Sequence, residues 1–123
     1  MQTGKRIKGK VVVMKRSTRI RTEIQKITRR VIDTYQPEKI ILFGSYAYGK
    51  PGANSDLDLL IIKKTSERFF DRLVNVRRIV SDPMRSIPFE PIVLTPDEVK
   101  ERLAIGDQFI EEILTKGEVL YAS

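Results

Sequence analysis

The sequence predicts an α+β domain in which helices surround a small sheet. Two observations predict this class. Some segments repeat apolar residues at helical spacing, whereas others are short continuous apolar runs bounded by turn residues. The two kinds of segment are interspersed along 123 residues, a length that suits one hydrophobic core. We therefore expect a single folded domain.

The amino-terminal segment is strongly basic. Residues 1–30 contain eleven Lys and Arg residues and one acid, a net charge of +10, whereas the other 93 residues carry −3. We interpret residues 1–17 as a basic arm, with a short strand at 9–15, and residues 18–123 as the folded domain. Such an arm suits nucleic acid or an acidic protein surface, and it equally suits a solvated tail. No aromatic residue precedes Tyr35 on which a base would stack.

The first half of the folded part predicts a helix and two strands. Residues 18–35 carry apolar side chains at helical spacing, and this helix is expected to end before Pro37. The run KIILF at 39–43 is continuously apolar and ends at a glycine, which is typical of a buried strand. The run DLDLLII at 56–62 predicts the next strand, and the Gly-, Pro- and Asn-rich residues between the two form a loop.

A second amphipathic helix and a third strand follow. Residues 66–82 predict the helix, which Pro83 ends. Its apolar stripe consists of Phe69, Phe70, Leu73, Val76 and Val80. Arg77 and Arg78 are expected on its outer face. The segment IPFEPIVL at 87–94 predicts the strand, and its prolines indicate an edge position or a bulge.

The carboxyl-terminal segment predicts two helices and a closing strand. In TPDEVKERL, Thr95 suits the N-cap, Pro96 suits the first helical position, and acids follow in the first turn. A further helix is expected at 107–116, ended by Gly117, and EVLYA at 118–122 predicts the closing strand.

Composition excludes several kinds of site. The chain has no Cys and no His, which excludes disulfides, thiolate nucleophiles, zinc knuckles and imidazole bases or ligands. Any chemistry must rest on carboxylates, hydroxyls, Lys, Arg and bound ions. Because no apolar run exceeds four residues, we expect no transmembrane helix, no signal peptide and no membrane partner, and we predict a cytoplasmic protein.

Two aspartates interrupt an apolar strand. Asp56 and Asp58 share one face of the strand, with Cα atoms roughly 6.5 to 7 Å apart, because side chains alternate. The opposite face carries Leu57, Leu59 and Ile61. Like charges side by side raise each other's pKa unless a cation neutralises them, and oxygen-only ligation favours Mg²⁺ or Mn²⁺. The alternative is a solvated pair at the strand mouth.

The Gly44-Ser45 pair predicts an anion site. A strand that ends in Gly-Ser and turns into a short helix at 46–48 presents N–H groups and a hydroxyl at a helix N-terminus, which suits phosphate. Gly44 would let the phosphate approach closely. Phosphate donors beside paired carboxylates indicate a nucleoside triphosphate with its metal ions.

Glu90 is the third acid of interest. It is the charged residue within the apolar segment 87–94, and it shares a strand face with Ile92 and Leu94. If this strand lies beside the strand at 56–62, Glu90 joins the two aspartates. The alternative is an exposed edge residue between two prolines.

These residues resemble the minimal nucleotidyltransferase family of the DNA polymerase beta superfamily. The resemblance lies in a Gly-Ser pair at 44–45, ten further residues, an Asp-Leu-Asp motif at 56–58, and a third acid in a later strand that leads into VLTPDE. It spans about residues 20–122, including the closing ILTKGEVLYA, and leaves the basic arm outside. It implies a polymerase-beta-like fold, a small mixed sheet flanked by helices.

The resemblance also implies how the site residues divide the work. Gly44 and Ser45 would hold the triphosphate of ATP. Asp56 and Asp58 would hold two Mg²⁺ ions, for which Mn²⁺ is a substitute. Glu90 would bind the catalytic metal and help to deprotonate the attacking hydroxyl. In-line attack on the α-phosphorus then releases pyrophosphate.

The implied activity is Mg-dependent transfer of AMP to a hydroxyl group. Relatives of this kind commonly pair with a small helical HEPN-type protein, as antitoxin to its toxin, so a hydroxyl of that partner, such as a tyrosine, is the expected acceptor. Two alternatives remain. One is a binding module that neutralises its partner by contact alone. The other is RNA nucleotidyl transfer, in which residues 1–30 grip the acceptor strand.

Two positions depart from the family pattern. Tyr48 stands where many relatives have Arg after GSYA, which removes a phosphate-facing cation. Glu90 stands where Asp is common. Its extra methylene would shift the catalytic metal by about an ångström, the scale at which misplacement lowers rates ~10²-fold.

Overall fold

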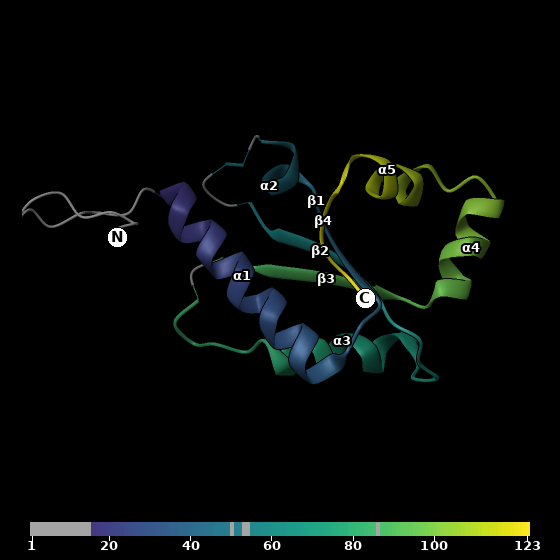
Figure 1. The fold of residues 1–123 in the computed structure, drawn as a ribbon, viewed down its shortest axis with the longest axis horizontal. Helices are drawn as coiled ribbons and strands as arrows, with labels where there is room; N and C mark the ends of the chain where they lie inside the picture. Colours follow the sequence, from purple (N-terminus) through teal and green to yellow (C-terminus); the bar gives the residue numbers. More distant parts are fainter. Residues whose placement is uncertain (1–15, 50, 53–54, 86) are drawn as a thin grey trace, which may run out of the picture.

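The computed structural model describes residues 16–49, 51–52, 55–85 and 87–123. The predicted strand at 9–15 and nearly all of the predicted arm lie outside these residues. The helices and strands are, in chain order, α1 (Arg16–Tyr35), β1 (Lys39–Phe43), α2 (Ser45–Tyr48), β2 (Leu57–Ile62), α3 (Phe69–Ile79), β3 (Phe89–Leu94), α4 (Pro96–Ala104), α5 (Gln108–Lys116) and β4 (Glu118–Ala122) (Figure 1).

The four strands form one mixed sheet in the order β3-β2-β1-β4. β1 pairs with both β2 and β4 in antiparallel register, whereas β2 and β3 are parallel. The predicted α+β class with a small mixed sheet is confirmed. β3 lies at an edge of the sheet, as its prolines indicate, because Pro91 has no N–H to donate to a further strand.

Helices cover both faces of the sheet. Leu57, Leu59 and Ile61 of β2 pack in one apolar cluster with side chains of α1 and α3. Leu60 and Ile62 pack in a second cluster with side chains of α4 and α5. The alternation predicted for DLDLLII is therefore confirmed: both faces of β2 are buried, and its odd-numbered residues share one of them.

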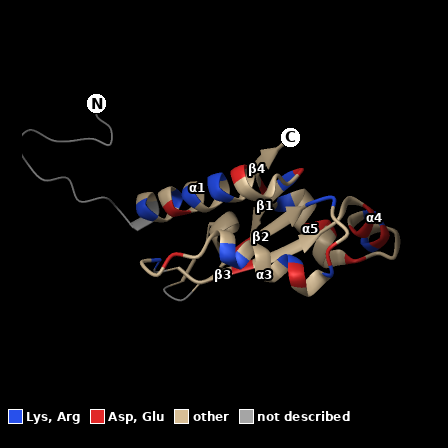
Figure 2. Cartoon of the chain, turned by 90° about the horizontal axis from the view of Figure 1, so that it is seen from below, with Lys and Arg blue, Asp and Glu red and all other residues tan. Residues whose placement is uncertain are grey.

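α1 packs through the predicted apolar stripe. Its members Ile20, Ile24, Ile27, Val31 and Tyr35 are all buried. The helix begins at Arg16, two residues before the predicted boundary of the folded part. Lys and Arg residues recur along α1 (Figure 2). None of the helices in the described part of the chain has the length and apolar character needed to cross a membrane.

α3 is shorter than predicted. It begins at Phe69 because Thr65 and Glu67 form a turn first, in which the N–H of Glu67 donates to Thr65 Oγ1. Phe69 and Phe70 were expected in the buried stripe but are 47% and 71% exposed. The buried stripe instead starts at Arg72, which is only 5% exposed.

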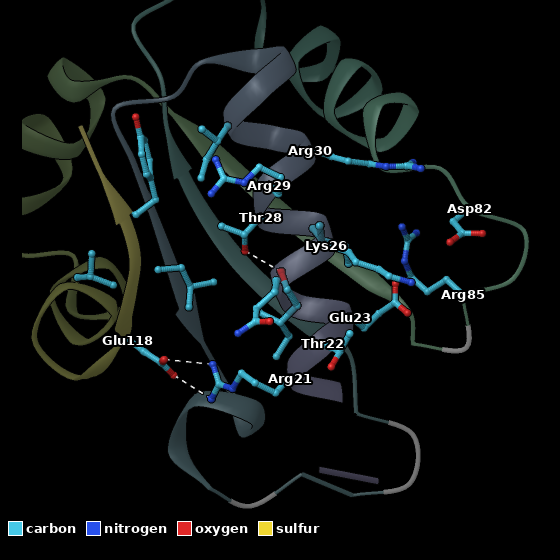
Figure 3. A pocket seen from close by; sticks show the side chains of 17 residues that line it. Arg21, Thr22, Glu23, Lys26, Thr28, Arg29, Arg30, Asp82, Arg85 and Glu118 are labelled. Atoms are coloured by element: carbon cyan, nitrogen blue, oxygen red, sulfur yellow. Dashed lines mark hydrogen bonds and ion pairs between the residues drawn. The ribbon is translucent and has the colours of Figure 1, made fainter. Parts of the chain in front are cut away.

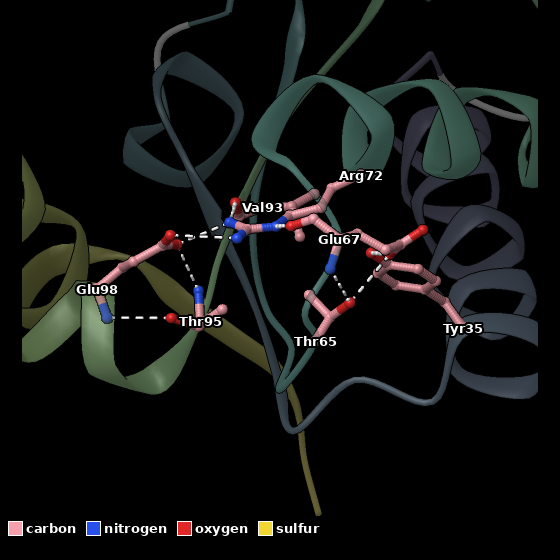
Figure 4. Close-up of polar contacts among 7 residues, drawn as sticks. All are labelled: Tyr35, Thr65, Glu67, Arg72, Val93, Thr95 and Glu98. Carbon is pink, nitrogen blue, oxygen red and sulfur yellow. Dashed lines mark hydrogen bonds and ion pairs between the residues drawn. The ribbon is translucent and has the colours of Figure 1, made fainter.

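Arg72 is buried because every side of its guanidinium is bonded (Figure 4). Its Nε donates to the carbonyl of Glu67 at 2.9 Å, and its Nη1 donates to the carbonyl of Val93 at 3.2 Å. Both terminal nitrogens bond the carboxylate of Glu98, at 2.7 and 3.1 Å. Arg72 thus ties α3, β3 and α4 together at the edge of the sheet.

α4 begins with the predicted cap. Thr95 Oγ1 accepts a hydrogen bond from the N–H of Glu98, and Glu98 in return accepts one from the N–H of Thr95. Pro96 occupies the first helical position. This capping box satisfies two otherwise unpaired donors, and it orients Glu98 toward Arg72.

Candidate functional site

The predicted site residues meet at one end of the sheet. β1 ends at Phe43, which lies opposite Asp58 in the antiparallel pair. Asp58 in turn lies opposite Glu90 in the parallel pair of β2 and β3. Gly44 follows Phe43 directly. The expectation that the third strand lies beside the Asp-Leu-Asp strand is confirmed, and Glu90 shares a face with Asp58 by the alternation of both strands.

Asp58 is a perturbed acid at this end of the sheet. Burial raises its pKa to about 6, and the negative charges of Asp56 and Glu90 act in the same direction. Asp56 is exposed and directly precedes β2. All three influences disfavour the ionised form of Asp58. The end of the sheet therefore concentrates negative charge without an offsetting cation at Asp58, which is an environment that favours a bound cation.

Gly44 is held against Asp58. Its backbone has φ 75° and ψ −161°, a region that side chains rarely tolerate. A Cβ at this position would collide with Asp58 Oδ2 and lie 3.2 Å from Asp58 Cγ. Glycine is therefore required twice, once by the backbone and once by the carboxylate. The phosphate contact expected of Gly44 stays a prediction.

The turn after Gly44 is a single helical turn. The N–H groups of Ala47 and Tyr48 both donate to the carbonyl of Gly44 at 3.0 Å. The N–H groups of Ser45 and Tyr46 come before this bonded pair, at the start of α2. They are the donors that an anion would meet. The role of Ser45 in holding phosphate also stays a prediction.

Glu90 bonds Arg77, which the sequence predicts, together with Arg78, on the outer face of α3. Arg77 Nη2 lies 3.2 Å from Glu90 Oε1, and Arg77 Nη1 donates to the carbonyl of Phe89 at 3.0 Å. Arg78 lies exposed, as expected for the outer face of α3. Arg77 is exposed as well, but it lies four residues after Leu73 and three before Val80, beside the apolar stripe of α3, and this spacing was the signal for its contact with β3.

The three acids have the oxygen ligands that a divalent cation prefers, but their side chains do not surround one common point. Within the described ranges, no three Asp, Glu, His or Cys side chains are arranged to hold a metal ion. Glu90 is engaged with Arg77, which leaves Asp56 and Asp58 as a pair. Carboxylate oxygens are the donors that Mg²⁺ and Mn²⁺ prefer, and Asp58 is partly buried beside two further acids, which raises its pKa.

A separate pocket of about 1090 Å³ lies along α1 and β4 (Figure 3). Its lining is rich in charged side chains, among them Lys26, Arg30 and Arg85. Arg21 closes one side through bonds of 3.1 and 3.3 Å to Glu118. None of the predicted site residues lines this pocket, so it is a feature distinct from the carboxylates.

Comparisons with known proteins identify a family and a similar fold. The model of the family described as "Polymerase beta, Nucleotidyltransferase" matches residues 24–123. Among solved structures, the fold is similar to that of a "putative nucleotidyltransferase" from Sulfolobus solfataricus, with a TM-score of 0.61 and 23% sequence identity over 86% of this chain and 83% of that chain. No curated protein gives a significant match.

Proposed function

The chain belongs to the polymerase beta nucleotidyltransferase family, and from this membership we propose that it transfers a nucleoside monophosphate from a nucleoside triphosphate to a hydroxyl group. The observation that carries the proposal is the meeting of Gly44, Asp58 and Glu90 at the ends of neighbouring strands. We favour ATP as the donor and a hydroxyl of a partner protein as the acceptor.

The division of roles follows from the positions of the side chains. Asp56 and Asp58 supply carboxylate oxygens for divalent cations. The N–H groups of Ser45 and Tyr46, at the start of α2, donate to the triphosphate. Bound Mg²⁺ ions would neutralise the charge that develops on the phosphate oxygens during transfer.

The transfer exchanges one phosphorus–oxygen bond for another. The acceptor oxygen forms a bond to the α-phosphorus, and the bond between the α-phosphorus and the bridging oxygen of the leaving pyrophosphate breaks. The hydroxyl proton passes to a carboxylate, for which Glu90 is the candidate, because a side chain that is about half exposed at the sheet edge is accessible to an acceptor.

The proposed acceptor lies on another macromolecule. Within the described residues, one sheet with its covering helices makes up the fold, and Glu90 at its edge is about half exposed. A small helical protein of the HEPN type, which this chain would modify as an antitoxin modifies its toxin, is the partner we propose. A hydroxyl of that protein, such as a tyrosine, would receive AMP.

The test is transfer of label from α-³²P-ATP. Purified protein is incubated with Mg²⁺ and the candidate partner, and the partner is then examined for label. We expect transfer by the wild type, and a loss of at least ~10²-fold with Asp58→Asn, since this carboxylate has a direct role. Asp71→Asn, at an exposed position on α3, is the matched control and retains activity.

Two outcomes contradict the proposal. Transfer that is equal in the wild type and Asp58→Asn would exclude catalysis at this site. Absence of transfer, together with unchanged inhibition of the partner by an Asp56→Asn, Asp58→Asn double variant, would instead identify a module that acts by contact alone.

The pocket along α1 favours a second candidate, in which the acceptor is RNA. Lys26, Arg30 and Arg85 line this pocket, and the segment 1–30 has a net charge of +10. Such a surface would bind a phosphate backbone without reading its sequence. The RNA would then lie along α1 and lead toward the end of the sheet.

RNA binding is tested through its salt dependence. If the pocket binds phosphates, a Lys26→Ala, Arg30→Ala variant binds single-stranded RNA more weakly, and the slope of log affinity against log salt falls by about one to two. An Arg78→Ala, Lys100→Ala variant is the control, because it removes the same two charges, one Lys and one Arg, from exposed positions on other helices. Equal slopes in all three proteins would exclude this candidate.

A further inference from the structure

Arg77 is a cation beside the carboxylates for which the proposed chemistry assigns no role. It lies on α3, whereas the side chain it bonds, Glu90, lies on β3. The two side chains are 49% and 53% exposed. Half-exposed partners exchange readily with solvent and ions, so the pair is a contact that another cation can break.

The position of Arg77 follows from the edge of the sheet. Pro88 directs its carbonyl inward, where it accepts a hydrogen bond from the N–H of Leu57 at 2.8 Å. The next carbonyl, that of Phe89, therefore faces away from the sheet, because carbonyls alternate along a strand. Arg77 Nη1 donates to this carbonyl at 3.0 Å.

This anchor brings Arg77 around the edge strand. α3 packs on the face of the sheet that holds Phe89 and Val93. Glu90 is on the opposite face, with Ile92 and Leu94. The bond to the Phe89 carbonyl holds the guanidinium at the rim between the two faces, and its second terminal nitrogen reaches the Glu90 carboxylate from there.

The bonded oxygen belongs to the acid that faces Asp58. Glu90 and Asp58 are direct partners in the parallel register. A divalent cation held by Asp56 and Asp58 would attract the same carboxylate. Arg77 and the cation therefore compete for the Glu90 carboxylate.

We propose that Arg77 is a positioning residue that restrains Glu90 and sets the affinity of the site for divalent cations. The inference rests on the proposed function, because it takes Asp56 and Asp58 as cation ligands. In the absence of cation, Arg77 holds Glu90 at the rim. When cation binds, Glu90 exchanges Arg77 for the cation, and the cost of that exchange lowers the affinity.

The test measures Mn²⁺ binding without nucleotide or acceptor. The electron paramagnetic resonance signal of free Mn²⁺ gives the dissociation constant for the purified full-length chain. We expect Arg77→Gln to bind Mn²⁺ about two- to five-fold more tightly than the wild type, the effect of removing a half-exposed ion pair. The control Arg78→Gln removes the same charge from the next residue of α3 and leaves the affinity unchanged.

A double-mutant cycle separates positioning from a general charge effect. Glu90→Gln is expected to bind Mn²⁺ more weakly than the wild type. In this background Arg77→Gln causes no further change, because Arg77 acts through Glu90. With Glu90 intact, the variant Arg77→Lys keeps the positive charge and one donor to Glu90. Its Mn²⁺ affinity should therefore be close to that of the wild type.

The outcomes distinguish this inference from the proposed function. Equal affinities of wild type and Arg77→Gln, equal gains by Arg77→Gln and Arg78→Gln, or a gain that persists with Glu90→Gln would each overturn the role of Arg77 alone. A wild type that binds no Mn²⁺, or that binds it equally after Asp58→Asn, overturns the proposed metal site and this inference with it.

Discussion

Gly44 and Asp58 occupy one small volume from two neighbouring strands. Gly44 directly follows β1. The carboxylate of Asp58 fills the space where a side chain of residue 44 would lie. The carboxylate is thereby fixed beside the turn into α2. This contact joins the predicted phosphate end and the predicted metal end of the site at the scale of single atoms.

Gly44→Ala is expected to disturb both the backbone and the carboxylate. The new methyl group would meet Asp58 Oδ2, so we expect a loss of about 2 to 3 kcal/mol in the free energy of unfolding and a loss of Mn²⁺ affinity. Urea denaturation and Mn²⁺ titration measure the two effects.

Gly49→Ala is the matched control for this change. Gly49 also has a positive φ, 81°, but no atom lies within 4 Å of its added Cβ. Gly49→Ala should therefore lower the free energy of unfolding by about 1 kcal/mol through backbone strain alone. Equal effects of the two substitutions on Mn²⁺ affinity would contradict the role of the contact with Asp58.

Asp58 gives the metal-free protein a defined pH dependence. Its pKa rises from 3.8 in the unfolded chain to about 6 in the folded protein, so between these values the folded state binds more protons. The stabilisation that protonated Asp58 contributes to the folded state is fully present below about pH 4, and it is lost as the pH rises through 6. Asp58→Asn removes the effect.

Denaturation of both proteins in EDTA from pH 4 to 7 tests this dependence. We expect Asp58→Asn to be more stable than the wild type at pH 7, by on the order of 1 kcal/mol after solvent screening, with the difference shrinking toward pH 4. A constant difference across this range would show that Asp58 titrates at its ordinary pKa.

α3 and the edge strand β3 form the next scale of organisation. Two arginines of α3 bond outward carbonyls of β3, Arg72 at Val93 and Arg77 at Phe89. Each also bonds a glutamate, Glu98 or Glu90. Arg72 is buried, and it holds α3, β3 and α4 together. Arg77 is half exposed, and we propose that it controls the site.

The buried pair is expected to stabilise the fold strongly. Arg72→Met keeps an apolar stem but leaves the Glu98 carboxylate and the Val93 carbonyl without this donor, so we expect a loss of about 3 kcal/mol in the free energy of unfolding. Arg72→Lys keeps the charge without the fork and should lose less, about 1 to 2 kcal/mol.

Chemical denaturation at neutral pH measures these losses. The control is Arg102→Met, which breaks a 3.4 Å surface ion pair with Asp107 and should leave the free energy of unfolding nearly unchanged. A second check is the pKa of Glu98, which the hydrogen bond from Arg72 holds below its usual range. If the Glu98 pKa in Arg72→Met equals that in the wild type, the pair contributes nothing.

At the scale of the whole molecule, β2 is the element that both layers share. Leu59 faces the cluster under α1 and α3, and Leu60 faces the cluster under α4 and α5. Both side chains are fully buried. Because the same strand closes both clusters, the two layers should unfold together, and the site at the start of β2 should be lost with them.

Truncation of either leucine tests this coupling. Leu59→Ala and Leu60→Ala should each cost about 2 to 5 kcal/mol. Hydrogen exchange should show the same change in opening free energy for slow amides of α1 and of α5 in both variants. Exchange that becomes faster in α5 alone after Leu60→Ala would show that the α4–α5 layer opens as a separate unit.

The elements followed from local patterns. Period-two alternation in DLDLLII predicted which residues of β2 share a face, and the helical stripe predicted the buried face of α1. Thr95 predicted the start of α4 because its partner in the capping box is only three residues away. Each of these signals acts over a few residues and can be read from the chain directly.

The partners of the arginines did not follow from local patterns. Arg72 is buried, whereas Phe69 and Phe70 are exposed, because its guanidinium bonds Val93 and Glu98, which lie 21 and 26 residues further along the chain. Arg77 lies within reach of Glu90 because it also donates to the Phe89 carbonyl, which faces outward at the edge of β3.

The sequence by itself determined the elements, the two faces of the central strand and the identity of the acids Asp56, Asp58 and Glu90. The tertiary structure decided which groups those acids meet. Parallel pairing set Glu90 opposite Asp58, antiparallel pairing set Gly44 against the Asp58 carboxylate, and the packing of α3 on the sheet edge supplied Arg77. The physical reason is range, because local patterns reach a few residues, whereas these contacts join residues 13 and more positions apart through strand register.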